Sequence, residues 1–206
     1  MSRRPLLGLL VIGLAACSPG EPAAGAPAAP QPGDSGRRET AVFAGGCFWS
    51  VEANFEAVPG VVAAVSGFAG GSVARPTYDQ VVRGGTGHLE AVQVTFDPAR
   101  ISYRQLVDRF WRTIDPTDPD GQFCDQGPGY ATAVFASAAQ KPVAEASRRA
   151  AAGRLGAAPF VTPVRDAVRF WPAGAEHQDF ARLNPVRYAG YSRFCGRGAR
   201  LRAVWG

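Results

Sequence analysis

The sequence contains few of the residues that build disulfide scaffolds or bind metals. Among its 206 residues, four are cysteine and two are histidine. Four cysteines without pairwise clustering are too few for a disulfide-dense fold. The three cysteines after residue 40 and the two histidines lack Cys-x2-Cys and His-x3-His spacing, so we expect no metal site. Each cysteine therefore needs an explanation of its own: Cys17, Cys47, Cys124 and Cys195.

Charged residues make up only 19% of the chain, with a formal net charge of +5, while 46% of the residues are hydrophobic. A chain of this composition can bury a core, which excludes a disordered or collagen-like protein. The positive charge is too small to indicate an obligate nucleic-acid-binding protein, so we expect no nucleic-acid partner. Internal repeats are absent from the sequence. We expect one folded domain, in a monomer.

Long hydrophobic runs are also absent. The longest, Leu6 to Ala16, has 11 residues, whereas a membrane span needs roughly 20. Two arginines precede it and Cys17 follows it, a pattern that predicts an export signal and resembles the lipobox of bacterial lipoprotein precursors. We therefore expect residues 1–16 to be a signal peptide and Cys17 to carry a lipid that anchors the protein in the bacterial cell envelope. Ordinary cleavage nearby, with Cys17 as an idle thiol, is the alternative.

The segment after Cys17 has no pattern of a folded element. Residues 18–36 are mostly Pro, Ala and Gly, with no aromatic side chain. Such a segment cannot bury enough apolar surface to become ordered, so residues 17–39 are predicted to form a tether. The folded domain is expected to span residues 40–206.

Within residues 40–206, hydrophobic periodicity and turn residues predict alternating strands and helices. Strands are predicted at 40–44, 61–68, 89–96, 130–136 and 164–170. Helices are predicted at 47–57, after the N-cap Ser102, and at 138–155. This order predicts an α/β (α+β) two-layer sandwich, with a mixed central sheet, helices packed on it and a ferredoxin-like core. Beyond residue 172 little regular pattern is present, so we expect an irregular C-terminal tail.

The most informative segment is Gly45-Gly46-Cys47, at the start of the first predicted helix. A glycine pair allows a sharp turn that delivers Cys47 to the helix N-terminus. Free N–H groups and the helix dipole stabilise a thiolate there, so we expect an acidic and nucleophilic thiol. The alternative is a small buried cysteine packed beside the aromatic residues Phe48 and Trp49.

Gly46-Cys47-Phe48-Trp49, followed by Ser50-Val51-Glu52, resembles the signature of the A-type peptide methionine sulfoxide reductases. Further motifs of that family follow in the same order: Pro76-Thr77-Tyr78, Gly87-His88-Leu89-Glu90, Phe96-Asp97-Pro98, Asp115-Pro116-Thr117, Asp125-Gln126-Gly127-Pro128-Gly129-Tyr130, Phe170-Trp171-Pro172 and Glu176-His177-Gln178. The resemblance covers residues 42 to about 190. It implies an oxidoreductase that repairs proteins by reducing methionine S-sulfoxide, peptide-bound or free.

The resemblance also implies roles for single residues. Cys47 corresponds to the nucleophile that becomes a sulfenic acid, and Glu90 to the acid that protonates the leaving oxygen. The other residues that match the family's site are Tyr78 and Tyr130, which hydrogen-bond the sulfoxide oxygen, Phe48 and Trp49, which hold the substrate methyl group, and Asp125, near the same pocket. Without the resemblance, Glu90 could be a solvent-facing strand residue and the two tyrosines could be core residues.

Two further thiols are available to reduce the sulfenic acid. Cys195 lies in a Gly- and Arg-rich segment that we expect to be flexible, and it is the first choice for the resolving cysteine. Cys124, beside Asp125, could be the resolver, a relay partner or an inert neighbour. No bound cofactor is implied, but an external thioredoxin-like dithiol donor is needed to return the disulfide to thiols. Arg193, Arg197, Arg200 and Arg202 are expected to form a solvated face, and a contact for anionic lipid headgroups or a docking surface for the electron donor are the alternatives.

Two other functions remain open at this stage. Cys47 and His88 could form the dyad of a hydrolase or acyltransferase. Alternatively, the chain could be a non-catalytic envelope lipoprotein that binds methionine. We expect His88 and His177 to be packing or capping residues, and Glu52 to be structural.

Overall fold

The computed structural model describes residues 36–206. The predicted signal peptide, the expected lipidation site Cys17 and most of the predicted tether lie outside the described residues. The described residues belong to one compact unit, Pro32–Gly206. None of the helices formed by residues 36–206 is both long enough and apolar enough to cross a bilayer.

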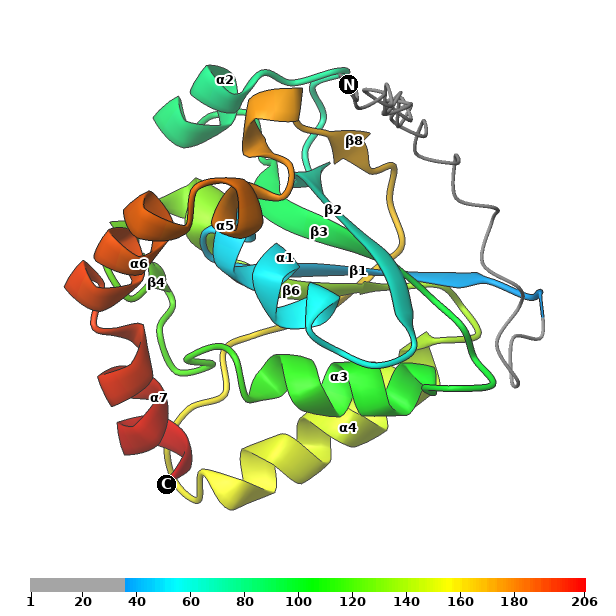
Figure 1. Ribbon diagram of the computed structural model, residues 1–206. Coiled ribbons are helices and arrows are strands. Elements are labelled where there is room, and N and C mark those ends of the chain that lie inside the picture. The colour runs from blue at the N-terminus through cyan, green and yellow to red at the C-terminus, as the bar shows by residue number, and fades with distance from the viewer. Residues whose placement is uncertain (1–35) are drawn as a thin grey trace, which may run out of the picture. The chain divides into compact units, whose positions relative to one another are not determined.

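The centre of the fold is a six-stranded mixed sheet (Figure 1). In spatial order its strands are β7 (Val164–Asp166), β6 (Thr132–Ala136), β1 (Glu39–Gly45), β3 (Leu89–Phe96), β2 (Val61–Ala69) and β8 (Trp171–Pro172). All neighbouring strands are antiparallel except β6 and β7. Because β3 lies between β1 and β2, the chain makes a split β-α-β unit through α1 (Phe48–Glu56). A second unit, β3-α3-β6, completes the predicted ferredoxin-like core.

Helix α3 (Tyr103–Trp111) begins at the predicted N-cap Ser102. The Ser102 hydroxyl accepts a hydrogen bond from the Gln105 N–H, and Gln105 Oε1 accepts one from the Ser102 N–H. This reciprocal pair satisfies two backbone donors at the helix start. The apolar side chains of α3 then face the core.

The two faces of the sheet are covered differently, because side chains alternate along each strand. On one face, α1, α3 and α4 (Lys141–Arg154) pack over large side chains, and the Phe43 ring lies 4.7 Å from that of Phe55 and 5.0 Å from that of Phe110. The opposite face is lined largely by alanines. There Phe170, in the segment that joins the two edge strands, packs against the sheet.

The segment expected to be an irregular tail is largely helical, which corrects that prediction. It contains α5 (Phe180–Leu183), α6 (Pro185–Phe194) and α7 (Arg197–Trp205), seen in Figure 1 as the orange to red helices. No residue of α6 is buried. A helix without an apolar stripe gives no periodic signal in the sequence, so its presence depends on tertiary contacts.

Contacts to the segment 112–123 fasten α7 to the body of the domain. Arg197 Nη1 donates to the Thr113 carbonyl at 2.7 Å, and Trp205 Nε1 donates to the Ile114 carbonyl at 2.9 Å. Arg200 forms an ion pair with Asp115. The expected solvated face is therefore wrong for Arg197, which is buried, whereas Arg200 is exposed as expected and also binds the buried Asp115.

Smaller differences concern the loops. The segment before β6 contains the hairpin β4 (Gly121–Gln122) and β5 (Asp125–Gln126) and the 3-10 turn η1 (Pro128–Tyr130). The last predicted strand, 164–170, forms only at β7, and the two-residue β8 follows it. Two other short helical elements are α2 (Tyr78–Arg83) and the 3-10 turn η2 (Ala175–His177).

Candidate active site

Gly46 turns the chain from β1 into α1. Its φ is +76°, and a Cβ at this position would lie 2.5 Å from the Cβ of Gln122. Only glycine adopts this conformation without strain and leaves room for Gln122. Cys47 is therefore delivered to the N-cap of α1, as predicted, and its carbonyl accepts a hydrogen bond from the Ser50 N–H at 3.1 Å.

Glu90, on β3, lies against the first turn of α1. Its Oε2 accepts a hydrogen bond from the Phe48 N–H at 2.9 Å. The side chain of Cys47 makes no capping bond, so Glu90 satisfies one of the free donors at the helix start. Glu90 is 1% exposed, and the solvent-facing alternative is wrong. Burial raises its pKa to about 8, despite the opposing hydrogen bond from Phe48, so the carboxyl group is protonated at neutral pH.

The Cys47 thiol is 6% exposed. Burial, and then the proximity of Glu90, raises its pKa to about 12. The expected acidic thiol is therefore absent from this state, because the loss of hydration outweighs the stabilisation at the helix start. Contacts with the Tyr191 hydroxyl and the Trp49 N–H act in the opposite direction and lower the pKa in part.

Tyr78 and Tyr130 approach the same site from different elements. Tyr78 is the first residue of α2, whose start is fixed by a capping box between Thr77 and Gln80, and Tyr130 ends η1. Their hydroxyl groups are hydrogen-bonded to each other. Burial first, and then proximity to Glu90, raises the pKa of both phenols, so both remain neutral O–H donors.

Five rings form the apolar wall of the site. Phe48 lies 6.4 Å from Trp49 and 6.1 Å from Tyr78, measured between ring centroids. His177 lies 4.5 Å from Tyr78 and 5.2 Å from Phe48, and Phe180 stacks on Trp49 at 3.7 Å. His177 does pack, as expected, but its place in this wall was not predicted. Burial lowers its pKa, so the ring is neutral at neutral pH.

Tyr191, on α6, joins Cys47 to Asp125. Its hydroxyl donates to Asp125 Oδ2 and is also hydrogen-bonded to the Cys47 thiol. Burial raises the pKa of Asp125, while the Tyr191 bond and the charge of Arg197 lower it in part. Sequence reasoning missed Tyr191 because its segment was expected to be a flexible tail.

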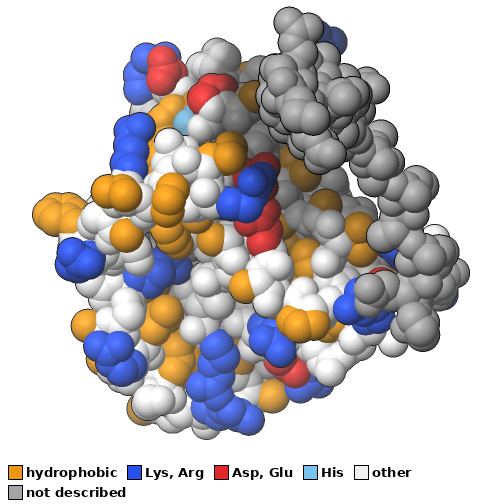
Figure 2. Space-filling view, viewed as in Figure 1, with side chains coloured by type: hydrophobic (Ala, Val, Ile, Leu, Met, Phe, Trp, Pro, Cys, Tyr) orange, Lys and Arg blue, Asp and Glu red, His pale blue; other side chains and the backbone are white. Residues whose placement is uncertain are grey.

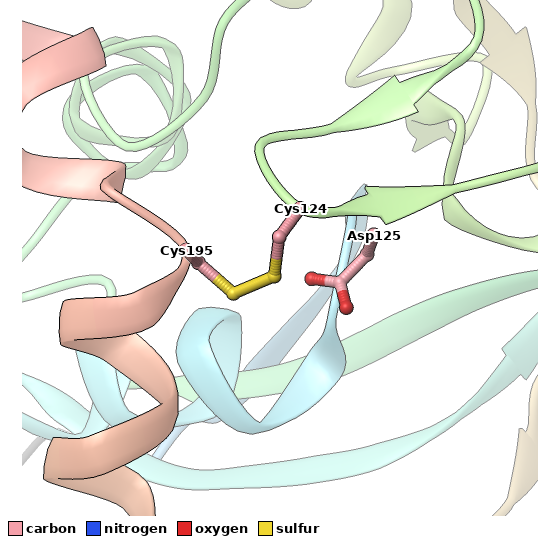
Figure 3. Close-up of side chains that lie close together, drawn as sticks. All are labelled: Cys124, Asp125 and Cys195. Carbon is pink, nitrogen blue, oxygen red and sulfur yellow. A yellow bond between two sulfur atoms is a disulfide. The ribbon is translucent and has the colours of Figure 1, made fainter.

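Cys124 and Cys195 are joined in a disulfide, with Cα atoms 4.7 Å apart (Figure 3). Among the described residues, Cys47 is the free cysteine. The two sulfurs and a carboxylate oxygen of Asp125 lie within 4.8 Å of one another. Because both sulfurs are in the disulfide, this group has no thiolate with which to bind a metal in this state.

His88 and Glu52 have structural contacts. His88 Nδ1 accepts from the Gly71 N–H at 3.1 Å, and its Nε2 lies 2.7 Å from the Val73 carbonyl. With both ring nitrogens occupied, His88 is not available as a base, and the Cys47–His88 dyad is not supported. Glu52 is buried and its Oε1 accepts from the Ser66 N–H at 3.2 Å. Burial raises the pKa of Glu52 to about 7.

A free buried thiol beside a protonated carboxyl group, with a separate disulfide, defines a thiol-dependent oxidoreductase. Comparison with known proteins specifies the class further. The family model described as "Peptide methionine sulfoxide reductase" matches residues 39–206. "Peptide methionine sulfoxide reductase MsrA 2" of Caulobacter vibrioides is 46% identical over 98% of this chain and 99% of its own length.

Two solved structures from Saccharomyces cerevisiae have a similar fold. Mxr1 in reduced form matches with a TM-score of 0.67 and 28% identity, over 74% of this chain and 88% of that one. Mxr1 in complex with Trx2 matches in fold, with a TM-score of 0.50 and 23% identity, over 72% and 88%. The chain belongs to the peptide methionine sulfoxide reductase family, and it is an oxidoreductase that reduces methionine sulfoxide in the repair of oxidised proteins.

Proposed function

We propose that Cys47 is the nucleophile in the reduction of the S epimer of methionine sulfoxide. This assignment is based on the surroundings of the Cys47 thiol. Cys47 is free while the other two described cysteines are bonded, and it lies beside the protonated Glu90. The choice of the S epimer comes from the family resemblance in the sequence.

The first step transfers oxygen from the substrate to the enzyme. The Cys47 sulfur attacks the sulfoxide sulfur, Glu90 donates its proton to the sulfoxide oxygen, and the resulting Glu90 carboxylate takes up the thiol proton of Cys47. The hydroxyls of Tyr78 and Tyr130 hold the sulfoxide oxygen by hydrogen bonds. The S–O bond of the substrate breaks as the oxygen passes to the Cys47 sulfur, so methionine leaves and Cys47 becomes a sulfenic acid. A carboxyl group with a pKa of about 8 can perform this role at neutral pH, because it still carries its proton. The apolar wall around Phe48 accommodates the substrate methyl group.

The sulfenic acid is then reduced in two steps. The Cys195 thiol attacks the Cys47 sulfur and releases water, which forms a Cys47–Cys195 disulfide. Cys124 attacks Cys195 and returns Cys47 to a free thiol, leaving the Cys124–Cys195 disulfide. The observed disulfide matches the product of this relay, and it supports the relay over an inert Cys124. Asp125 and Tyr191, between the thiol and the disulfide, are placed to carry the protons.

A thioredoxin-like dithiol then reduces the Cys124–Cys195 disulfide. The fold likeness to Mxr1 in complex with Trx2 is compatible with such a donor, and the exchange chemistry requires one. No tightly bound cofactor is needed for any step, because the electrons come from this dithiol.

We further propose that the protein acts in the bacterial cell envelope, held to the membrane by a lipid on Cys17. The support is the sequence of residues 1–17, with its basic start, short apolar run and lipobox. Replacement of Cys17 by serine in the cell should move the protein from the membrane fraction to the soluble fraction. Retention of this variant in the membrane would contradict the lipid anchor.

The catalytic assignment is tested with the purified protein and dithiothreitol as reductant. The protein should reduce a peptide with methionine S-sulfoxide and leave the R epimer unchanged, and Cys47→Ser should abolish turnover. Activity that survives Cys47→Ser would overturn the assignment of the nucleophile. A non-catalytic methionine-binding protein would instead retain peptide binding and form no sulfenic acid on exposure to the sulfoxide, as measured with a dimedone-type reagent.

A further inference from the structure

The two sulfurs of the Cys124–Cys195 disulfide have different surroundings. Cys124 is exposed and occupies the tip of the hairpin between β4 and β5. Cys195 is half-buried and lies between α6 and α7. Figure 3 shows the same contrast, with the hairpin turn on one side of the disulfide and the two helices on the other.

We propose that the external dithiol attacks Cys124 rather than Cys195, and that it docks on the surface formed by the Phe123–Cys124 turn and the neighbouring Phe194. This inference rests on the relay described under the proposed function, and it adds the order of the exchange and the docking surface. Neither the family motifs nor the comparisons assign these.

Access decides which sulfur of a disulfide is attacked first, since the incoming thiolate has to reach that sulfur along the S–S axis. A protein-borne thiol approaches from solvent, where Cys124 is exposed. Cys195 is then the leaving group. It is held at the end of α6, one helical turn after Tyr191, whose hydroxyl contacts the Cys47 thiol. The thiol released by this route therefore lies one turn from Tyr191, on the helix that contacts Cys47.

The donor reduces the disulfide in two successive exchange steps. The donor thiolate forms a bond with the Cys124 sulfur, the Cys124–Cys195 bond breaks, and Cys195 leaves as a thiolate that takes a proton from solvent. The second donor thiol then attacks the donor sulfur of the mixed disulfide, which releases Cys124 as a thiolate and leaves the donor as a disulfide. Two electrons pass from the donor to the cysteine pair, and both cysteines are ready for another cycle.

An exposed apolar side chain, Phe194, lies next to the disulfide. Phe194 is 84% exposed, and two further exposed apolar side chains lie earlier along the same helical region, Val186 on α6 at 86% and Leu183 at the end of α5 at 60%. Phe194 directly precedes Cys195, so its Cα lies within about 8.5 Å of the Cys124 Cα, given the 4.7 Å between the two cysteines and about 3.8 Å between neighbours. In Figure 2, hydrophobic side chains gather on the left of the view, where Figure 1 places α6.

The partner that we propose for the reduction of this disulfide is a small thioredoxin-fold protein, which presents an accessible dithiol within an apolar surface. Such a protein has to cover Phe194 in order to bring its thiolate to Cys124. An exposed apolar side chain beside the reacting bond is the kind of anchor that gives a transient complex most of its affinity.

A second approach to the disulfide defines the opposite outcome. A groove of about 380 Å³, lined by Asp115, Asp118, Phe123, Cys195 and Arg200, reaches Cys195. The Asp115–Arg200 ion pair contributes to its lining. Attack on Cys195 through this groove would leave Cys124 as the released thiol, so the identity of the modified cysteine distinguishes the two routes.

The test traps the intermediate. The full chain with Cys47→Ser, its Cys124–Cys195 disulfide formed with diamide, is mixed with a thioredoxin whose second active-site cysteine is replaced by serine. The mixture is quenched with acid within seconds and alkylated, and its peptides are mapped by mass spectrometry. We expect the thioredoxin on Cys124 and the alkyl label on Cys195 in about nine of ten complexes. Thioredoxin on Cys195 in half or more of them, or no complex at all, would overturn the proposal.

A second measurement tests the docking surface in the otherwise unaltered protein. We expect Phe194→Ala to lower the ratio of thioredoxin-driven to dithiothreitol-driven kcat/KM at least fivefold, through a higher KM for thioredoxin. Val168→Ala removes a 46%-exposed side chain elsewhere on the surface and serves as the matched control. An unchanged ratio in Phe194→Ala, or an equal loss in Val168→Ala, would remove Phe194 from the docking surface.

Two results distinguish a wrong relay from a wrong order of attack. If the relay were wrong, one turnover of the wild-type protein without reductant would leave no Cys124–Cys195 disulfide. If only the order of attack were wrong, that disulfide would form and the trapped thioredoxin would lie on Cys195.

Discussion

Tyr191 is hydrogen-bonded to the thiol of Cys47, and its own hydroxyl donates to Asp125. Tyr191 and Cys47 are far apart in the sequence and meet because α6 lies against the start of α1. Tyr188, one turn earlier on α6, donates to the Ser50 hydroxyl at 3.3 Å. These two tyrosines hold α6 over the thiol, although α6 contributes nothing to the core.

Replacement of Tyr191 by phenylalanine should slow the reaction of Cys47 with iodoacetamide about tenfold at pH 8, since it removes the hydroxyl that can turn its proton from Asp125 to the Cys47 thiolate when the thiol ionises. The alkylation rate of the wild-type protein should still rise with pH up to 10, because the pKa of Cys47 is raised to about 12. Tyr188→Phe, which loses only the bond to Ser50, is the matched control. A plateau near pH 7 in the wild-type protein would contradict a buried, neutral thiol.

Glu90 should confer a pH dependence on the first chemical step. The reacting form carries a proton on both Cys47 and Glu90, because the thiol proton is transferred within the site during the step. The single-turnover rate of sulfoxide reduction should therefore be constant below pH 7 and decrease as the pH rises through about 8, the pKa of Glu90. Glu90→Gln should lower this rate by a factor of about 100 to 1,000, as is typical for the loss of a general acid. It should also abolish the decrease near pH 8. A residual decrease of the same size in Glu90→Gln would assign it to another group.

Replacement of Cys195 or of Cys124 should cause different species to accumulate after one turnover without reductant. Cys195→Ser should retain the sulfenic acid on Cys47, detected by dimedone labelling. Cys124→Ser should instead accumulate the Cys47–Cys195 disulfide, detected by peptide mapping. The reverse assignment, with a Cys47–Cys124 disulfide in Cys195→Ser, would make Cys124 the resolving residue.

Arg197 should contribute more to stability than its place on the terminal helix suggests. Its guanidinium group is buried, donates to the Thr113 carbonyl and lies 4.2 Å from the Phe123 ring. Arg197→Ala should lower the free energy of unfolding by about 2 to 4 kcal/mol, because the part-buried hydrogen bond to the Thr113 carbonyl and the packing of the buried side chain are lost. The exposed Arg202→Ala should change it by less than about 0.5 kcal/mol. Chemical denaturation measures both, and equal effects would contradict the prediction.

Glu52 should make the protein less stable as the pH rises. Its pKa in the folded state is raised to about 7, mainly by burial, from the ordinary value of 4.5. Between these values the folded state binds more protons than the unfolded state, so stability is lost with increasing pH in this window. Glu52→Gln retains an acceptor for the Ser66 N–H without the titration, and its Tm should exceed that of the wild type more at pH 8 than at pH 6. A constant Tm difference would contradict this.

The central elements follow from local patterns in the sequence. The strand at β3 alternates, the capping box at Ser102 is a local motif, and the turn at Gly46 requires glycine. Each of these depends on residues within one element or one turn. For that reason the ferredoxin-like core and the position of Cys47 were predicted correctly.

The C-terminal region could not be predicted in the same way. Helix α6 buries no residue, so it has no apolar stripe for periodicity to detect. Tyr191 reaches Cys47, and Arg197 reaches Thr113, only when the helices are packed against the rest of the domain. His177 is a similar case. It lies in a family motif, but its place among the aromatic rings depends on η2 lying over α1.

The sequence by itself determined the family and the place of Cys47 at a helix start, because these depend on residue types at fixed short spacings. Only the tertiary structure decided the ionisation of the site and the pairing of the thiols. Burial beside Glu90 keeps Cys47 neutral, against the local preference of a helix start. Cys124 and Cys195 are 71 residues apart and meet only because α7 is fastened beside the β4–β5 hairpin. Both outcomes depend on distances through space, and local sequence patterns do not specify those distances.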